Sequence, residues 1–205
     1  WQPGDILVQR RLAETLKKIQ AEGPDAFYRG ALAAQIEQFM DTSGGYIRQD
    51  DLNAYEAQWR EPIQIDYKNY RMISMPPPSS GGIALGQLLL TLEQELQATD
   101  IFEPQAAHAI VEAERRTYAD RAQYLGDDDF VDIPDYLLDS SYLRQRWKSF
   151  DPDRATQSTQ IGLDSIQIQK ESFETTHTSA VDADGLAVSL TTTLNSNYGS
   201  KVMHP

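Results

Sequence analysis

The spacing of apolar residues predicts helices over most of the chain and strands near its end. Apolar residues fall at helical spacing in residues 5–22, where we expect Asp5 to cap the N-terminus. The same spacing recurs in residues 24–40, although Gly30 weakens the middle of that segment. A shorter helix is expected over residues 50–55. The first part of the chain is therefore predicted to be helical.

A change to alternating residues predicts a β-hairpin over residues 62–75, with its turn at Lys68 and Asn69. Three prolines, residues 76–78, end this hairpin because proline cannot donate to a ladder of backbone hydrogen bonds. Helical spacing then returns, and further helices are expected over residues 83–96, from Pro104 to about Leu125, and within 135–149.

A polar region precedes the last strands. Residues 151–172 are rich in Gln, Ser and Asp, and we expect an exposed connector that reaches about residue 174. After it, alternation in residues 176–181 and 186–194 predicts a second hairpin, because residues 182–185 are typical of a turn. The expected order is a helical part, an exposed connector and a hairpin.

Composition excludes several classes of function. The net charge of −13 disfavours a nucleic acid or an anionic membrane as partner. The absence of cysteine excludes disulfides, thiolate metal sites and cysteine nucleophiles. The three histidines are scattered, and residues 127–129, all aspartate, lack the spacing of a calcium-binding loop, so no metal site is predicted. No apolar run approaches the roughly 18 residues of a membrane span.

Thr175 is the most specific candidate for a catalytic residue, as a nucleophile. A threonine inside a chain is a poor nucleophile, but as the first residue of a chain it has its own α-amino group to accept the hydroxyl proton. An α-amino group has a pKa of about 7.7–8, which makes it available as a base near neutral pH. This chemistry requires a cut between Glu174 and Thr175. The residues alone favour a structural role for a threonine at the start of a strand.

Five motifs, in order and spacing, resemble the γ-glutamyltranspeptidase family. They are GPDAFYRG at residues 23–30, GGYI followed by DDL at 44–52, MPPPSSGGI at 75–83, YADR followed by YLGD at 118–127, and the Thr-Thr-His opening of 175–195. The resemblance covers nearly all of residues 3–199. It implies an internal fragment, with residues 1–174 as the C-terminal part of the large subunit and 175–205 as the start of the small subunit.

The resemblance also implies a fold and a reaction. The fold is α+β, part of the αββα sandwich of N-terminal nucleophile hydrolases, to which this chain supplies helices and a hairpin of the central sheet. Thr175 would cut the chain after Glu174 and then attack a γ-glutamyl amide such as glutathione. Water or the amine of an amino acid or peptide would accept the γ-glutamyl group. No cofactor is implied.

Two more residues receive roles from the resemblance. Thr193 is expected to hydrogen-bond the nucleophile and to contact substrate, and Asn195 is expected to hold the α-amino or α-carboxylate end of the glutamyl group. His177 is expected to pack or hydrogen-bond structurally, since an N-terminal threonine needs no imidazole. Residues 79–82, Ser-Ser-Gly-Gly, are open to two interpretations, an anion cradle and a helix cap.

Two alternatives stay open. A related acylase, of cephalosporin or poly-γ-glutamate type, would keep the threonine nucleophile and change the acyl group, and an unprocessed fragment would be non-catalytic. The family's substrate arginine, acidic pair and oxyanion glycines lie outside residues 1–205, so the chain alone is expected to be nearly inactive. The expected partners are the substrate, the amine acceptor and the remainder of both subunits, in a periplasmic or secreted location.

Overall fold

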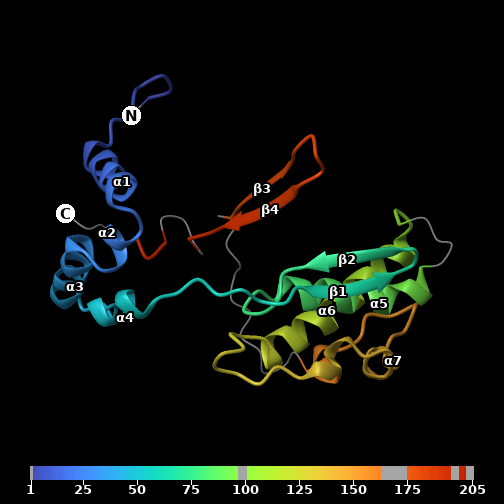
Figure 1. Ribbon diagram of the computed structural model, residues 1–205. Coiled ribbons are helices and arrows are strands. Elements are labelled where there is room, and N and C mark those ends of the chain that lie inside the picture. Colours follow the sequence, from blue (N-terminus) through green and yellow to red (C-terminus); the bar gives the residue numbers. More distant parts are fainter. Residues whose placement is uncertain (1, 97–100, 163–174, 195–198, 202–205) are drawn as a thin grey trace. The chain divides into compact units, whose positions relative to one another are not determined.

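The computed structural model describes residues 2–96, 101–162, 175–194 and 199–201 (Figure 1). Contacts divide the chain into two compact units, one made of residues 1–58 and 170–205 and the other of residues 59–169. This division follows contacts and not covalent processing, so the predicted subunit boundary between residues 174 and 175 stays a prediction.

The first unit begins with helices that differ in two places from those expected. The helices are α1 (Arg10–Glu22), α2 (Asp25–Tyr28), α3 (Ala31–Ser43) and α4 (Gln49–Ala54). The prediction that Asp5 caps the first helix is wrong, because α1 begins five residues later with Gln9 at its N-cap. Asp5 instead closes a local turn, in which its carboxylate accepts a hydrogen bond of 2.8 Å from the backbone N–H of Gln2.

The helix expected over residues 24–40 is broken at Gly30. Gly30 has an extended backbone and serves as the N-cap of α3. A Cβ atom at this position would lie only 3.0 Å from the backbone oxygen of Ala26. The helix therefore breaks at the extended backbone of Gly30, and the short distance to the preceding turn favours glycine at this position.

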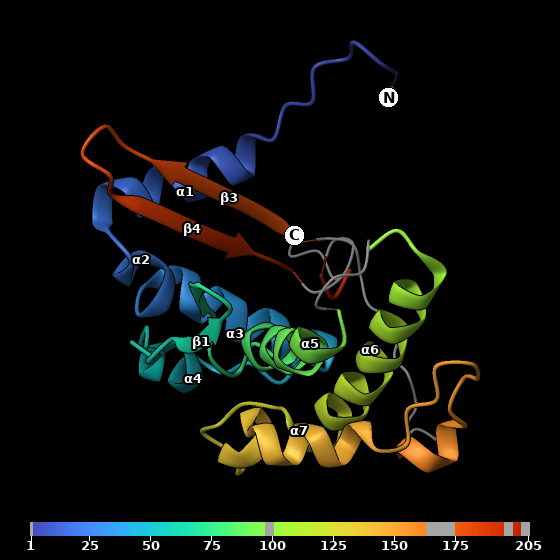
Figure 2. The ribbon, with the colours of Figure 1, turned by 90° about the vertical axis from the view of Figure 1, so that its right-hand side faces the viewer.

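A short hairpin begins the second unit as expected. Strands β1 (Ile63–Tyr67) and β2 (Tyr70–Ser74) pair antiparallel, with Tyr67 opposite Tyr70 across the predicted turn. The next helix, α5 (Gly81–Glu95), lies between β1 and α6 (Pro104–Tyr124), as Figure 2 shows. Gly86 of α5 faces this core, where an added Cβ would lie 2.7 Å from Leu138 and 3.0 Å from Ile65.

The core of the second unit forms around α6, whose bounds agree with the prediction. Its buried face contains four alanines, which allow close packing of neighbouring helices: Ala106, Ala109, Ala113 and Ala119. The 3₁₀ helix η1 (Asp135–Leu138) and α7 (Ser140–Trp147) pack against α5, and the 3₁₀ helix η2 (Ser158–Ile161) contacts α6.

The connector was expected to be exposed, and this is wrong for part of its first half. Thr156 and Ile161 are buried. The backbone N–H of Thr156 donates to Glu112, 3.2 Å away, and its hydroxyl donates to the backbone oxygen of Ser149. The first hydrogen bond links the segment to α6 and the second links it to the residues after α7, so Thr156 is buried although the segment is polar in composition. The remainder of the connector, residues 163–174, lies outside the described residues.

The second hairpin confirms the predicted strands and turn. Strands β3 (Thr176–Val181) and β4 (Ala187–Thr192) pair antiparallel, from Thr176 opposite Thr192 to Val181 opposite Ala187. In the turn, the Asp182 carboxylate accepts hydrogen bonds of 2.9 Å from the backbone N–H groups of Asp184 and Leu186. Gly185 has a φ of +88°, a conformation that favours glycine.

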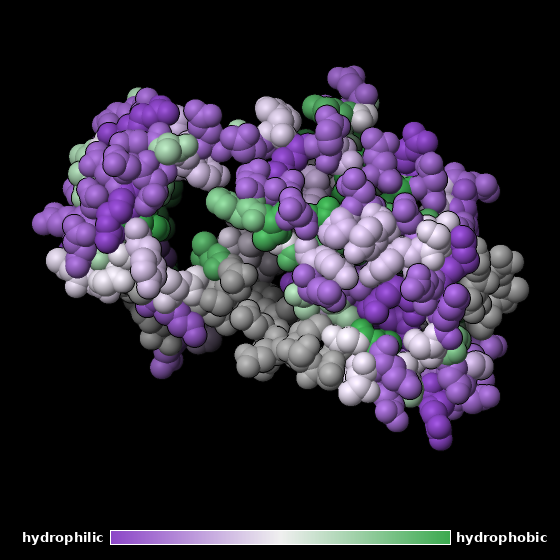
Figure 3. Space-filling model, turned by 90° about the horizontal axis from the view of Figure 1, so that it is seen from below, coloured by the Kyte–Doolittle hydropathy of each residue, from purple (hydrophilic) through white to green (hydrophobic). Residues whose placement is uncertain are grey.

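The exposed surface carries polar residues together with large apolar side chains, among them Trp59 and Phe130. Figure 3 shows hydrophilic residues over most of its visible face, with apolar residues in small groups. None of the helices in the described part of the chain combines the length and the apolar composition needed to cross a membrane.

Candidate active site

The open end of the β3–β4 hairpin brings Thr175 and Thr193 together. Thr175 immediately precedes β3 and Thr193 immediately follows β4. Because Thr176 lies opposite Thr192, the next position outward places Thr175 opposite Thr193. The hydroxyl of Thr175 donates to the hydroxyl oxygen of Thr193 at 3.1 Å. The contact expected from the turn between the two strands is therefore present.

This contact orients a hydroxyl group without ionising it. A threonine hydroxyl has one donor and two acceptor positions, so Thr193 can accept the Thr175 proton in a hydrogen bond and keep another position for a further partner. A hydroxyl is too weak a base to remove that proton. In the intact chain the nitrogen of Thr175 is part of a peptide bond, so an effective base appears only when that bond is cut.

His177 is held by hydroxyl groups, as expected for a structural hydrogen-bonding role. Its Nδ1 lies 2.8 Å from the hydroxyl of Thr191, and its Nε2 lies 3.2 Å from the hydroxyl of Ser179 and 3.0 Å from that of Ser189. Both ring nitrogens are therefore engaged within the hairpin.

Two of the predicted site residues cannot be placed. Glu174, on the other side of the expected cleavage site, and Asn195, the expected substrate-binding amide, both lie outside the described residues. The structure thus brings together Thr175 and Thr193 and leaves the roles of Glu174 and Asn195 as predictions.

The Ser-Ser-Gly-Gly segment forms the start of α5. The backbone N–H of Gly81 donates to the Ser79 hydroxyl at 3.3 Å, and the Ser80 hydroxyl accepts a hydrogen bond of 3.0 Å from Arg121 of α6. These contacts join the first turn of α5 to α6. They agree with the interpretation of a helix start, and the anion-cradle interpretation stays untested.

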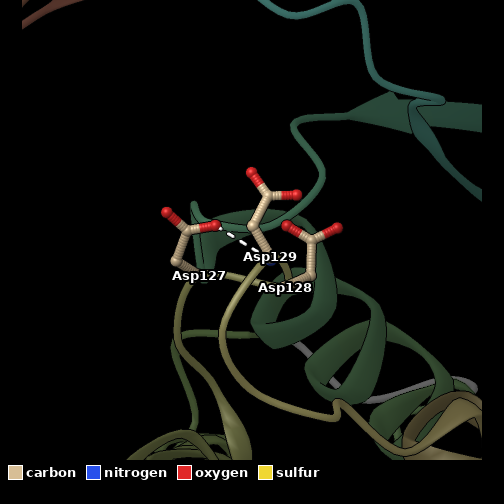
Figure 4. Close-up of side chains that lie close together, drawn as sticks. All are labelled: Asp127, Asp128 and Asp129. Atoms are coloured by element: carbon tan, nitrogen blue, oxygen red, sulfur yellow. Dashed lines mark hydrogen bonds between the residues drawn. The ribbon is translucent and has the colours of Figure 1, made fainter. Parts of the chain in front are cut away.

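Three neighbouring carboxylates form an acidic cluster after α6, shown in Figure 4. Arg60 lies 2.6 Å from the carboxylates of Asp128 and Asp129 and 3.7 Å from that of Asp127. Asp127 also accepts a hydrogen bond of 3.1 Å from the backbone N–H of Asp129. A guanidinium and the local turn supply partners for this cluster, so its geometry is explained without a metal ion.

A buried charged pair on α6 was not anticipated. Glu112 and Arg116 are 1% and 4% exposed, and a guanidinium nitrogen of Arg116 lies 2.7 Å from the Glu112 carboxylate. Burial is the largest influence on Glu112 and opposes its ionisation, but hydrogen bonds from Arg116, Thr156 and Arg115 together outweigh it and lower the pKa of Glu112 to about 2.

A second ion pair, in which only the carboxylate is buried, lies two turns further along α6. Arg146 of α7 contacts the Asp120 carboxylate at 2.9 Å, and the side-chain amide of Gln87 donates to the same carboxylate at 3.0 Å. Burial raises the pKa of Asp120 against the lowering effect of Arg146, Tyr142 and Gln87. The two pairs join α5, α6 and α7, so their evident role is to hold the second unit together.

Comparison with known proteins gives the family. The family model described as gamma-glutamyltranspeptidase matches residues 1–205. The chain belongs to the γ-glutamyltranspeptidase family. Its membership confirms the resemblance drawn from the five motifs.

Relatives within and beside this family cover nearly the whole chain. The glutathione hydrolase proenzyme of Escherichia coli (strain K12) is 43% identical over 202 residues, 98% of this chain and 35% of that protein. The acylase ACY 1 proenzyme of Pseudomonas sp. (strain SE83) is 39% identical over 206 residues, 100% of this chain and 36% of that protein. The chain therefore spans about a third of the length of these curated relatives.

Solved structures support the same fold. The crystal structure of Helicobacter pylori γ-glutamyltranspeptidase matches with a TM-score of 0.74 and 40% identity over 82% of this chain and 49% of that one. The cephalosporin acylase from Bacillus halodurans matches with a TM-score of 0.68 and 29% identity over 73% of this chain and 28% of that one. The α+β fold class, as part of the N-terminal nucleophile hydrolase sandwich of γ-glutamyltranspeptidases, is thereby confirmed.

Proposed function

We propose that the complete protein containing this chain is a γ-glutamyltranspeptidase and glutathione hydrolase. It would transfer the γ-glutamyl group of glutathione-like substrates to water, amino acids or peptides. The observation that carries this proposal is the hydrogen bond of 3.1 Å between the hydroxyls of Thr175 and Thr193 at the end of the hairpin. Relatives named glutathione hydrolase proenzyme, at 43% and 41% identity, support the substrate class.

The first proposed step is self-cleavage. The Thr175 hydroxyl oxygen attacks the backbone carbonyl carbon of Glu174, and the bond from that carbon to the Thr175 nitrogen breaks. The hydroxyl proton ends on that nitrogen, which becomes an amine, and an ester joins Glu174 to the Thr175 side chain. Water then hydrolyses the ester, which leaves a carboxylate on Glu174 and a free α-amino group on Thr175. The word proenzyme in the names of the relatives supports a processing step of this kind.

The second proposed step is acyl transfer. The free α-amino group of Thr175 accepts the hydroxyl proton as the oxygen attacks the γ-carbonyl carbon of the substrate. The amide bond breaks, the leaving amine takes up the proton, and the γ-glutamyl group stays on Thr175 as an ester. Water or an acceptor amine then cleaves that ester. Two half-reactions on one nucleophile predict ping-pong kinetics without a cofactor.

Two neighbouring residues have supporting roles in this proposal. Thr193 orients the Thr175 hydroxyl through the observed contact and reaches the substrate once it binds. Asn195 follows two residues later and offers an amide that can both donate and accept, which suits the α-amino and α-carboxylate groups of a glutamyl residue. The rest of the binding site would come from the remainder of the two subunits.

A related acylase is the second candidate. Two observations favour it: the 39% identity to the acylase ACY 1 proenzyme and the structural match to a cephalosporin acylase. Each of these proteins aligns with most of this chain. The higher identity to glutathione hydrolases favours γ-glutamyl transfer. A periplasmic or secreted location remains a prediction that rests on the resemblance.

The experiment that separates these functions is a substrate comparison with the full-length chain that carries these residues. The protein is incubated with glutathione, with a γ-glutamyl anilide plus glycylglycine, and with a cephalosporin amide, and the products are quantified. Release of glutamate from glutathione and formation of a γ-glutamyl peptide support the proposal. Cleavage of the cephalosporin amide alone supports the acylase. The 205-residue chain by itself is expected to be nearly inactive, because each missing oxyanion donor costs about 10²–10³ in rate.

A further inference from the structure

One face of the second hairpin carries a row of polar side chains that begins at Thr175. Alternate residues of a strand point to the same side, so three cross-strand pairs share this face. The pairs are Thr175 with Thr193, His177 with Thr191, and Ser179 with Ser189. The next pair on this face, Val181 with Ala187, is apolar and ends the row.

His177 is the central member of the row. Its Nδ1 contacts Thr191 at 2.8 Å, on the opposite strand, and its Nε2 contacts Ser189 at 3.0 Å, one level further along that strand. The same Nε2 lies 3.2 Å from Ser179 on its own strand. A neutral imidazole has one donor and one acceptor nitrogen, and hydroxyls can serve as either, so these contacts are compatible with both tautomers.

These contacts lie next to the end of the backbone pairing. The last paired residues are Thr176 and Thr192, so Thr175 and Thr193 meet one position beyond the ladder. Strand ends separate most easily because fewer backbone hydrogen bonds hold them. On this face, the side-chain hydrogen bond that follows the Thr175–Thr193 contact along the hairpin joins His177 to Thr191.

A run of threonines at the end of β4 and just after it makes such a link between the strands useful. Residues 191–193 are all threonine, so β-propensity alone does not distinguish the pairing that brings Thr193 beside Thr175 from a neighbouring one. A slip by one residue would turn the Thr193 hydroxyl to the other face. The turn at Asp182 lies at the far end of the hairpin, whereas the contact between His177 and Thr191 lies beside the nucleophile, where the register matters for the site.

We propose that His177 is a positioning residue for Thr175: by linking β3 to Thr191 and Ser189 of β4, it holds the Thr193 hydroxyl within hydrogen-bond reach of the nucleophile. This proposal rests on the proposed role of Thr175. His177 acts through the strands, because the observed partners of its ring nitrogens are the hydroxyls of Thr191, Ser179 and Ser189 and not the Thr175 hydroxyl.

The test uses the full-length chain and follows the appearance of the new N-terminus at Thr175. His177→Phe keeps an aromatic ring and removes both nitrogens, and it is expected to slow processing by roughly 10–10²-fold, the range for a small displacement of a reacting group. His177→Asn restores an amide near the Nδ1 position and is expected to recover part of the rate. Thr178→Val, on the other face of β3, is the matched control and is expected to process at the normal rate.

A second variant keeps the test valid if His177→Phe folds poorly. Thr191→Val removes the hydroxyl that Nδ1 contacts, and it is expected to slow processing by a similar factor. Combining it with His177→Phe is expected to cause little further loss, because both changes remove the same link. In processed enzyme, kcat is expected to fall while KM for the γ-glutamyl substrate changes little.

Three results would overturn the proposal. His177→Phe could process and turn over at the normal rate, the effects of His177→Phe and Thr191→Val could multiply, or His177→Asn could be as slow as His177→Phe. A failure of the proposed role of Thr175 looks different, because then the unsubstituted chain also fails to expose Thr175, and the positioning role fails with it.

Discussion

Thr175 and Thr193 are joined through their hydroxyl groups, 3.1 Å apart, although 18 residues separate them in the sequence. The turn at residues 182–185 folds one strand back on the other, so two small side chains that are distant along the chain become cross-strand neighbours. In the function proposed for this chain, the contact links the nucleophile to the residue expected to orient it.

Removal of the Thr193 hydroxyl is expected to slow self-cleavage. Thr193→Val keeps the shape of the side chain and removes the acceptor, so processing of the full-length chain should fall by roughly 5–10-fold, the factor that corresponds to one hydrogen bond of about 1 kcal/mol. Thr193→Ser keeps a hydroxyl and should process faster than Thr193→Val. Time courses of precursor disappearance measure both rates, and equal rates for the two variants would contradict this role.

The buried pair of Glu112 and Arg116 makes a prediction about stability. Arg116→Met removes the buried one of the two arginines that contact the Glu112 carboxylate and leaves only the less buried Arg115, so the free energy of unfolding should fall by up to about 3–5 kcal/mol. Adding Glu112→Gln removes that charge and should recover part of the loss. Urea unfolding of the single and double variants measures both effects. A double variant less stable than Arg116→Met would show that the stranded charge is not the cause.

Acid should weaken the protein through the same carboxylate. The pKa of Glu112 is lowered to about 2 in the folded protein, below its usual value of 4.5, so the unfolded chain binds more protons between these values. The stability contributed by Glu112 is therefore complete above about pH 4.5 and is lost as the pH falls towards 2, in total roughly 3 kcal/mol. Glu112→Gln should show a flatter loss of stability across this range, and an unchanged slope would exclude Glu112 as its source.

Close packing at Gly86 predicts a cost for a single added methyl group. Gly86→Ala would bring a Cβ to 2.7 Å from Leu138 and 3.0 Å from Ile65, so we expect a loss of about 1–3 kcal/mol in the free energy of unfolding. Gly81→Ala, in the first turn of the same helix, meets only the Ser79 hydroxyl at 3.5 Å and should change stability little. Chemical unfolding of both variants measures the difference, and equal stabilities would contradict the packing argument.

Local pattern predicted most of the elements but not the places where distant segments meet. The apolar spacing and Pro104 correctly predicted where α6 begins, and the turn residues correctly predicted the second hairpin. The break at Gly30 was missed because a single glycine only weakens a helix, and apolar spacing does not show that its backbone is extended. Asp5 failed as a cap because it bonds the N–H of Gln2 instead.

The burial of the charged residues on α6 also could not be predicted from local sequence pattern. Glu112 and Arg116 are four residues apart, a spacing that usually indicates an exposed ion pair on a helix. Their position on one face with Ala109 and Ala113 was the available signal of burial. The hydrogen bond from Thr156, 44 residues after Glu112, could not be inferred from spacing. By contrast, the Thr175–Thr193 contact was predictable because a single turn determines it.

The most direct measurement is intact mass with N-terminal sequencing of the full-length chain, beside its Thr175→Ala variant and a Thr178→Ala control. The account predicts that the unsubstituted chain and the control yield a fragment beginning Thr-Thr-His (Thr-Thr-His-Ala in the control), while Thr175→Ala stays whole. An unsubstituted chain that remains intact after long incubation, or a Thr175→Ala variant cut at the same bond and rate, would contradict the role of Thr175 as nucleophile.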